Sequence, residues 1–365
     1  MVKRIQYGIW VFGWITMVLP GLQESSYAQS PLMDVTPTTL PTMEVNHLIL
    51  DSGTILVRQA DRLFMLDPMT LSQKLYLELD PEPETVVGDI EFSPDRCYLY
   101  YTVFDATRDT SPSASQLVKL DLTTNTEEVL LSDSRLTRIS PVSPGGGYIL
   151  VGMVDMVNVA DSFFCLMDIE SSDCSPMGDY IGFGNFFWIS DNEFVGTLRN
   201  TVEVDKAQIT HLRTIEIAGD YFLEAATLTL DGQNLVWIAA QPREDGYVSK
   251  FISIDVGSGD IVELHYTIEG VQAASNKIQF SPNGNYVAIT YAHHLNILDL
   301  ESGDVVAQAE NVLRFVWTPT CTNLLVVLDD EMPSTPLQLS RFDLSTQEFA
   351  ASVDFTEDVT LLIVP

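Results

Sequence analysis

Clustered carboxylates and one pair of histidines are the side chains in this sequence that could bind a metal ion. Asp329-Asp330-Glu331 follows an apolar segment, and carboxylate oxygens are the ligands that Ca²⁺ prefers. His293-His294 would need further ligands from distant segments to hold a transition metal. Solvated loop charge explains the first cluster, and a tight turn between two strands explains the second. We therefore predict no metal site and no cofactor.

Motifs for catalysis are missing from the sequence. It contains no G-x-S-x-G nucleophile elbow, no H-E-x-x-H zinc motif, no P-loop and no EF-hand spacing. A carbohydrate-cleaving enzyme would need two carboxylates gathered from distant segments, and one sequence does not identify such a pair. The sequence favours a non-catalytic role and leaves enzymatic activity open. The sequence also contains an aromatic run, formed by Phe183, Phe186, Phe187 and Trp188. Packing in the core explains this run better than stacking against a sugar does.

Loops of variable length carry the best candidates for a binding surface. Three of them place aromatic, arginine or methionine side chains beside carboxylates, a mixture that suits a protein interface. We predict that these loops emerge on one face of the fold and bind a protein or peptide. The predicted binding residues are Phe104, Asp105, Arg108, Asp109, Arg243, Glu244, Asp245, Tyr247, Asp329, Asp330, Glu331 and Met332.

The charge of the chain excludes several partners. It has 51 Asp and Glu against 18 Lys and Arg, and its formal net charge is −33. Such a surface repels nucleic acid and anionic lipid headgroups. The charge leaves the oligomeric state open, and a structural cell-surface domain remains an alternative to a binding module.

Two repeating patterns indicate which elements present these loops. A polar turn recurs between apolar strands, most clearly as Phe92-Ser93-Pro94-Asp95 and Phe280-Ser281-Pro282-Asn283. An acidic residue ends the third strand of each repeat, at intervals of 39 to 54 residues: Asp67, Asp121, Asp168, Glu216, Asp255, Asp299 and Asp343. Both patterns predict an all-β, seven-bladed β-propeller of four-stranded antiparallel blades. A pair of β-sandwiches is the alternative fold.

The N-terminus predicts export. Lys3 and Arg4 precede a short apolar run, and Ser26-Tyr27-Ala28 places small residues where a signal peptidase cleaves. We expect a signal peptide over residues 1–28, an extended Pro/Thr-rich leader over 29–44 and one propeller domain over 45–365. The chain would then be secreted or periplasmic, without membrane insertion, although an uncleaved anchor is the alternative. A Cys165–Cys174 disulfide is left open because simple strand register offsets the two residues.

The repeats resemble those of a known class of exported protein. The turns at 281–287, 93–99 and 143–149, together with Leu298-Asp299-Leu300-Glu301-Ser302-Gly303, are similar to the WD40-like repeat of TolB-type propellers. The resemblance covers roughly residues 45–355. It implies an extracytoplasmic propeller that acts as a protein-interaction scaffold, and it assigns no binding residue, because the shared motifs are turn and core positions.

Overall fold

The computed structural model describes the chain from Leu50 to Val364, apart from several short segments. The residues outside the description are 1–49, 80–84, 106–114, 155–162, 178–185, 199–200, 207–209, 217–221, 244–245, 270–276, 292, 330–335, 356–358 and 365. All regular elements in the described part are strands, and none of it forms a helix long and apolar enough to cross a membrane. The predicted signal peptide and leader lie outside the described residues.

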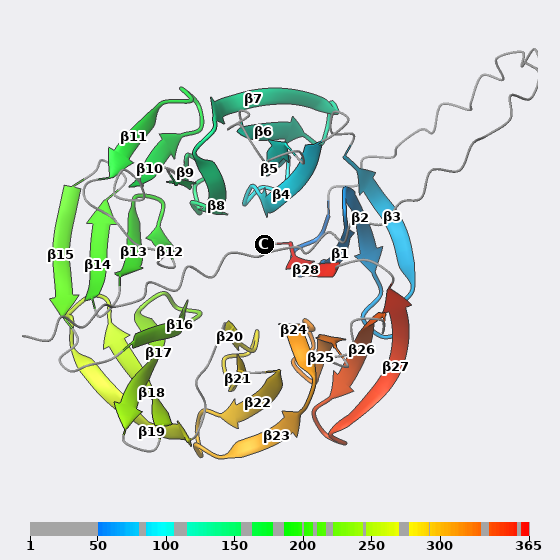
Figure 1. Cartoon of the computed structure of the whole chain (residues 1–365), viewed down its shortest axis with the longest axis vertical. Helices are drawn as coiled ribbons and strands as arrows, with labels where there is room; N and C mark the ends of the chain where they lie inside the picture. The colour runs from blue at the N-terminus through cyan, green and yellow to red at the C-terminus, as the bar shows by residue number, and fades with distance from the viewer. Residues whose placement is uncertain are drawn as a thin grey trace, which may run out of the picture. The chain divides into compact units, whose positions relative to one another are not determined.

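The described residues form seven four-stranded antiparallel sheets, which are the blades of a propeller (Figure 1). The expected all-β propeller with four-stranded blades is therefore confirmed. From the inner strand outwards, blade one contains β28 (Val359–Ile363), β1 (Ile55–Gln59), β2 (Arg62–Leu66) and β3 (Gln73–Glu78). Blade two contains β4 (Thr85–Phe92), β5 (Tyr98–Asp105), β6 (Ser115–Asp121) and β7 (Thr126–Asp133). Blade three contains β8 (Leu136–Val142), β9 (Tyr148–Met153), β10 (Phe163–Asp168) and β11 (Cys174–Met177).

The remaining blades follow the same order along the chain. Blade four contains β12 (Phe186–Ser190), β13 (Glu193–Leu198), β14 (Thr201–Lys206) and β15 (Thr210–Glu216). Blade five contains β16 (Phe222–Leu228), β17 (Asn234–Arg243), β18 (Gly246–Asp255) and β19 (Ile261–Glu269). Blade six contains β20 (Lys277–Phe280), β21 (Tyr286–Tyr291), β22 (His294–Asp299) and β23 (Val305–Ala309). Blade seven contains β24 (Val312–Trp317), β25 (Asn323–Leu328), β26 (Leu337–Asp343) and β27 (Glu348–Phe355).

The last strand of the chain closes the ring. β28 pairs antiparallel with β1, from Ile55 opposite Ile363 to Gln59 opposite Val359. Val359 and Leu361 are buried in a cluster that also contains side chains of blade seven. The C-terminal apolar run thus supplies the inner strand of blade one, which removes the open edge that an unclosed ring would have.

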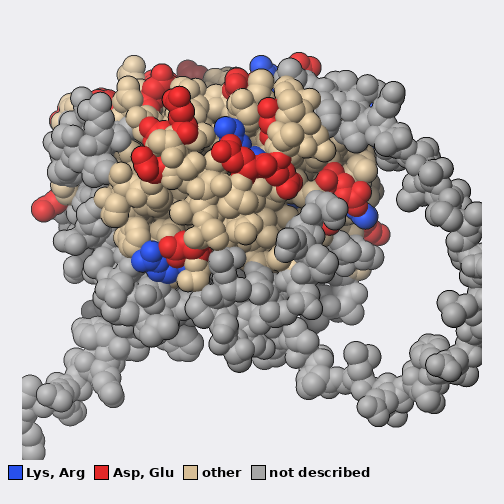
Figure 2. Space-filling model, turned by 90° about the horizontal axis from the view of Figure 1, so that it is seen from above, with Lys and Arg blue, Asp and Glu red and all other residues tan. Residues whose placement is uncertain are grey.

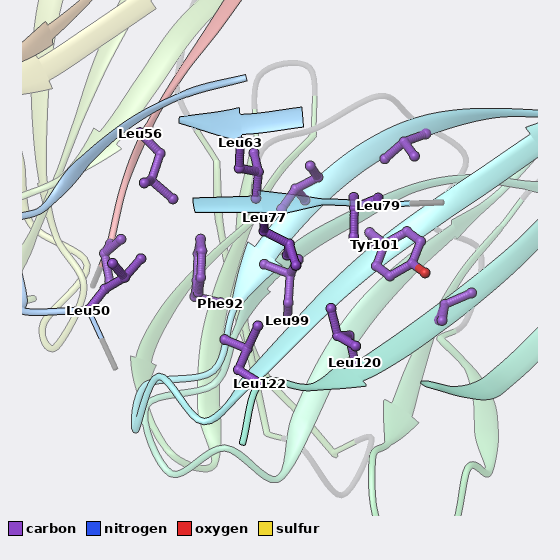
Figure 3. Close-up of a cluster of buried hydrophobic side chains, with 14 residues drawn as sticks. Leu50, Leu56, Leu63, Leu77, Leu79, Phe92, Leu99, Tyr101, Leu120 and Leu122 are labelled. Carbon is purple, nitrogen blue, oxygen red and sulfur yellow. The ribbon is translucent and has the colours of Figure 1, made fainter. Parts of the chain in front are cut away.

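Apolar clusters fill the space between neighbouring blades. Figure 3 shows the cluster between blades one and two, where Leu56 and Leu63 face Leu99 and Leu120. All four side chains are buried, and burying a leucine contributes about 1.5–3 kcal/mol. Because each inner and middle strand packs against a blade on both sides, its sequence is apolar at successive positions rather than at alternate ones.

Side-chain hydrogen bonds explain the repeated polar residues. In the turn after β4, Ser93 Oγ accepts from the backbone N–H of Tyr98 at 2.9 Å, and Ser281 repeats this with Tyr286 at 3.0 Å. At the end of β6, Asp121 Oδ1 accepts from the backbone N–H groups of Thr123 and Thr124. A hydrogen bond from the Thr123 hydroxyl, with smaller effects from the two backbone bonds, lowers the pKa of Asp121 to about 2. The recurring acidic residue is therefore a turn-forming residue.

The cysteine pair that was left open forms a disulfide in blade three. The strand register places Cys174 opposite Met167 and Cys165 opposite Pro176, so the two cysteines lie diagonally across β10 and β11. Their Cα atoms are 5.6 Å apart, a separation that a disulfide spans. The other two cysteines, Cys97 and Cys321, are free thiols that are half-buried.

Candidate functional site at the inner edge of the blades

The predicted binding loops share one end of the blades. In blade two the register pairs Thr85, the first residue of β4, with Asp105, the last residue of β5. The loop after β5 therefore leaves the blade where the innermost strand begins. We call this end, where the innermost strands start and the second strands finish, the entry face.

The structure describes part of the predicted binding set. Phe104 and Asp105 end β5, Arg243 ends β17, and Tyr247 lies at the start of β18 opposite Pro242. Asp329 follows β25, and its backbone N–H donates to the carbonyl oxygen of Asn311 at 2.9 Å. The topology brings these five positions to the entry face of three blades. Outside the described residues lie Arg108, Asp109, Glu244, Asp245, Asp330, Glu331 and Met332.

Phe104 also has a packing role. A Cβ atom added at Gly88 would collide with the Phe104 ring and with the Thr102 hydroxyl. Gly88 lies where the pairing of β4 and β5 shifts register, between Val87 and Ile90. The missing side chain at Gly88 therefore allows the half-buried Phe104 to lie against the innermost strand, which fixes its place at the entry face.

Charged side chains lie beside the free backbone edge of the innermost strands. The carboxylate Oδ2 of Asp89, on β4, accepts from the backbone N–H of Ile139 on β8 at 3.1 Å. The guanidinium of Arg58, on β1, donates to the carbonyl oxygens of Val87 and Gly88. Each bond crosses from one blade to the next. These side chains satisfy backbone groups that have no neighbouring strand at the centre of the ring.

Loss of water raises the pKa of both carboxyl groups on β4. Asp89 is exposed, yet protein surrounds its carboxyl closely enough that loss of water raises the pKa. The hydrogen bond from Ile139 and the charges of Arg138 and Arg58 act in the opposite direction and lower it, with a smaller total effect. Burial, with a smaller effect from the Asp89 charge, raises the pKa of Glu91 to about 8. At neutral pH Glu91 is therefore mostly protonated.

A second group of charges lies between blades six and seven. Lys277 begins β20, and its ammonium donates to the carbonyl oxygen of Phe315 on β24 at 2.7 Å. Loss of water, with a smaller effect from the Arg314 charge, lowers the pKa of Lys277 to about 8. Arg314 in turn donates to the carbonyl oxygen of Val359 on β28. Two cations thus meet at this junction of a strongly acidic chain.

The outer side of the propeller is different. Figure 2 shows the ring from its side, with acidic side chains spread over the visible surface and few basic ones among them. On the described outer strands of blade five, Lys250 Nζ pairs with Glu263 Oε1 at 2.7 Å.

Sequence reasoning missed this inner-edge set, although a signal was present. Lys277 and Asp89 each lie three residues before the phenylalanine of a Phe-Ser-Pro turn. A charge at a fixed place in an inner strand is unexpected for a residue that only fills a core. The partners Ile139 and Phe315 belong to the following repeat, and spacing within one repeat does not reveal them.

The structure also places the histidine pair and the aromatic run. His293 has a φ of 65° and forms the turn between β21 and β22, as predicted for the histidine pair. Phe186 and Trp188 pack against the ring of Phe194 and belong to the core cluster of blades three and four. Phe183 lies outside the described residues. Within the described part of the chain, no three His, Cys, Asp or Glu side chains are arranged to hold a metal ion.

Comparisons with known proteins identify the fold. No family model and no curated protein matches this sequence. Among solved structures, the C-terminal WD40 domain of Sif2 is 14% identical with a TM-score of 0.57, and the match covers 85% of each chain. A hypothetical selenium-binding protein from Sulfolobus tokodaii is 10% identical with a TM-score of 0.59, covering 85% of this chain and 93% of the other.

TolB from Acinetobacter baumannii also appears among the similar structures. It is 16% identical with a TM-score of 0.47, and the match covers 84% of this chain but 64% of TolB. At these identities the likeness extends to the architecture alone. The chain therefore has the fold of a β-propeller with four-stranded antiparallel blades, similar to WD40 propellers.

Proposed function

We propose that this chain is an exported, non-catalytic propeller that binds a protein or peptide at its entry face. The observation that carries the proposal is the set of charged side chains on the inner edge, next to the loops that carry Phe104, Arg243 and Asp329. Arginine and aromatic side chains are enriched in protein interfaces, and fixed charges give an interface its specificity.

An exposed apolar side chain supports the same location. Val86, near the start of β4, is 49% exposed and lies opposite Phe104 in the register. It stands on the inner edge, three residues before Asp89. A partner that covers Val86 and Phe104 would bury apolar area while its polar groups meet the neighbouring charges.

The test is differential capture of partners from the native extracytoplasmic fraction. One variant replaces Phe104, Arg243, Tyr247 and Asp330 with alanine. The matched control replaces four exposed apolar residues of outermost strands, Val129, Ile261, Val305 and Phe349. We expect the first variant to lose the captured partner and the control to retain it. Equal capture by both folded variants would contradict the proposed surface.

Export is part of the proposal and has its own test. The small residues of Ser26-Tyr27-Ala28 after an apolar run support a mature chain that begins at Gln29. Mass spectrometry of the N-terminal peptide from the exported pool should identify Gln29 as the first residue. A chain that still begins at Met1 in that pool would contradict cleavage and favour an anchor.

One observation favours a second candidate function, cleavage of a carbohydrate. Glu91, which is mostly protonated at neutral pH, and Asp89 stand two residues apart on β4, and a pair of carboxyl groups is what glycoside hydrolysis uses as acid and nucleophile. The hydrogen bond from Ile139 to Asp89 gives that carboxylate a structural role instead. A panel of chromogenic glycosides should remain uncleaved by this chain. Hydrolysis that disappears in Glu91→Gln would establish the enzymatic alternative.

A further inference from the structure

The junctions between blades two and three and between blades six and seven are built from equivalent positions. Asp89 and Lys277 each stand three residues before the last residue of an innermost strand, Phe92 and Phe280 respectively. Each side chain reaches the following blade at the same place. Asp89 bonds to the backbone of Ile139, and Lys277 bonds to the backbone of Phe315.

The arginines of the two junctions are equivalent as well. Arg138 immediately precedes Ile139 on β8, and Arg314 immediately precedes Phe315 on β24. Each arginine stands opposite the penultimate residue of the second strand, which is Gly152 in blade three and Val327 in blade seven. The repeat therefore places an arginine next to position 89 in one junction and next to position 277 in the other.

The charges in these equivalent places differ in sign. In the first junction, an aspartate faces an arginine, and the attraction of Arg138 acts to lower the pKa of Asp89. In the second junction, a lysine faces an arginine, and the repulsion of Arg314 acts to lower the pKa of Lys277. A lysine therefore stands in the second junction where the first has an aspartate, beside an arginine in each case.

The Lys277 ammonium has N–H donors left for a ligand. A lysine ammonium carries three N–H donors, and within the described part of the chain Lys277 uses one of them, for the Phe315 carbonyl oxygen. The residue as a whole is exposed, although protein surrounds its ammonium closely enough to lower its pKa. It also lies over the Phe315 ring, with Nζ 5.2 Å from the ring centroid, which holds the ammonium in place.

We propose that the junction of blades six and seven binds a carboxylate group of the peptide partner, between Lys277 and Arg314. This proposal rests on the proposed function and adds the chemical class that the entry face recognises. A carboxylate in this place would restore the arrangement that Asp89 and Arg138 already form. Bonds between a carboxylate and these two cations would be charge-assisted, and arginine is well shaped to hold a carboxylate with two parallel bonds.

The net charge of the chain sets the conditions for binding. Its 51 acidic residues repel an acidic peptide at long range. At about 0.15 M salt the Debye length is about 8 Å, so distant charges are screened while contacts at the junction are less affected. Binding is therefore expected at physiological salt, and lower salt should bring no large gain in affinity.

The test is fluorescence anisotropy of the full exported chain with three labelled probes. The first is hexaglutamate with both ends blocked, and the second is hexaglutamine with a free C-terminal carboxylate. The third, hexaglutamine with both ends blocked, has no charge. We expect binding of at least one of the first two probes, which also reveals whether a side-chain or a C-terminal carboxylate is recognised, and we expect no binding of the third.

Variants locate the binding. Lys277→Gln should weaken binding of the charged probe at least tenfold, and Lys277→Arg should retain it. Lys250→Gln is the matched control, because Lys250 is paired with Glu263 on the outer strands of blade five. Equal affinity for the wild type and a folded Lys277→Gln would overturn the proposal, as would equal binding of all three probes or binding of none. If Lys277→Gln still captures the native partner and the four-residue loop variant does not, the proposed function stands and the carboxylate site fails.

Discussion

The junction of blades two and three and the junction of blades six and seven use one backbone arrangement with opposite charges. Asp89 accepts a hydrogen bond from the N–H of Ile139, whereas Lys277 donates one to the carbonyl oxygen of Phe315. In an antiparallel strand the N–H and C=O of one residue point to the same edge. The inner edge therefore offers both polarities, and the side chain from the preceding blade selects one.

The comparison extends to the next inner position. Glu91 and Gln279 each stand one residue before the terminal phenylalanine of their strands. Glu91 has a pKa of about 8 and is mostly neutral at pH 7, while glutamine is always neutral. This position between blades thus holds an uncharged group in both junctions, and the place three residues before the turn holds a charged one. These two junctions share the position and the polarity of the group, and they differ in the sign of its charge.

Loss of ring closure should have the largest effect, because it removes a whole strand and its buried side chains. The strand concerned, β28, also accepts the hydrogen bond from Arg314 at the junction of blades six and seven, through the carbonyl oxygen of Val359. Deleting residues 359–365 removes the inner strand of blade one and exposes the apolar surface that Val359 and Leu361 cover. We expect the melting temperature to fall by several degrees or more, measured by circular dichroism. An unchanged melting temperature would show that β28 adds nothing to the ring.

Reversing the charge at position 89 should be the next largest effect. Asp89→Lys loses the acceptor for the Ile139 N–H and places a third cation near Arg58 and Arg138. We expect a loss of about 1–3 kcal/mol in urea unfolding.

The reverse substitution, Lys277→Asp, tests whether the two junctions tolerate either charge at this position. Lys277→Asp should cost less than Asp89→Lys, because the N–H of Phe315 lies at the same edge as its carbonyl and Arg314 can pair with the new carboxylate. If Lys277→Asp is as destabilising as Asp89→Lys, the two junctions are not equivalent.

These effects involve positions that sequence reasoning could predict only in part. The turns were predictable because Ser93 and Asp121 bond to backbone groups two to five residues away, which demands particular residue types at fixed spacing. The contact from Asp89 to Ile139 spans 50 residues. Register shifts in β4 and β8 also change which residues face the next blade. Spacing along the sequence carries no information about such shifts.

A pH-dependent difference should distinguish Glu91 from Gln279. The unfolded chain releases the Glu91 proton near pH 4.5, and the folded chain retains it up to about pH 8. Between these values the unfolded state binds fewer protons, so the wild type loses stability as pH rises, by up to about 1.4 kcal/mol per pH unit.

Glu91→Gln cannot ionise and should not show this loss. The stability of Glu91→Gln relative to the wild type should therefore increase from pH 5 to pH 8, measured by urea unfolding at each pH. Gln279→Asn serves as the control, because it changes the equivalent position without adding a titrating group. A constant difference between Glu91→Gln and the wild type across this range would mean that Glu91 ionises normally.

The smallest effect concerns the pKa of Lys277 itself. Carbon-13 NMR of the lysine side chains should show one lysine that titrates near pH 8, assigned to Lys277 by its absence in Lys277→Arg. Arg314→Gln should raise this pKa, because it removes the repelling charge. A Lys277 that titrates near its usual value of 10.5 would show that this junction is open to water and holds no constrained cation.

The central claim, that the partner binds at the inner edge of the entry face, is tested most directly by site-specific photocrosslinking. Val86 on β4 and Val305 on the outer strand β23 are each 49% exposed, so a photoreactive amino acid at either place has the same access to solvent. Cells expressing each variant are irradiated, and the crosslinked partner is identified by mass spectrometry. The account predicts one specific crosslinked species from position 86 and none from position 305. A specific crosslink from position 305 alone would place the partner on the outer strands and contradict the account.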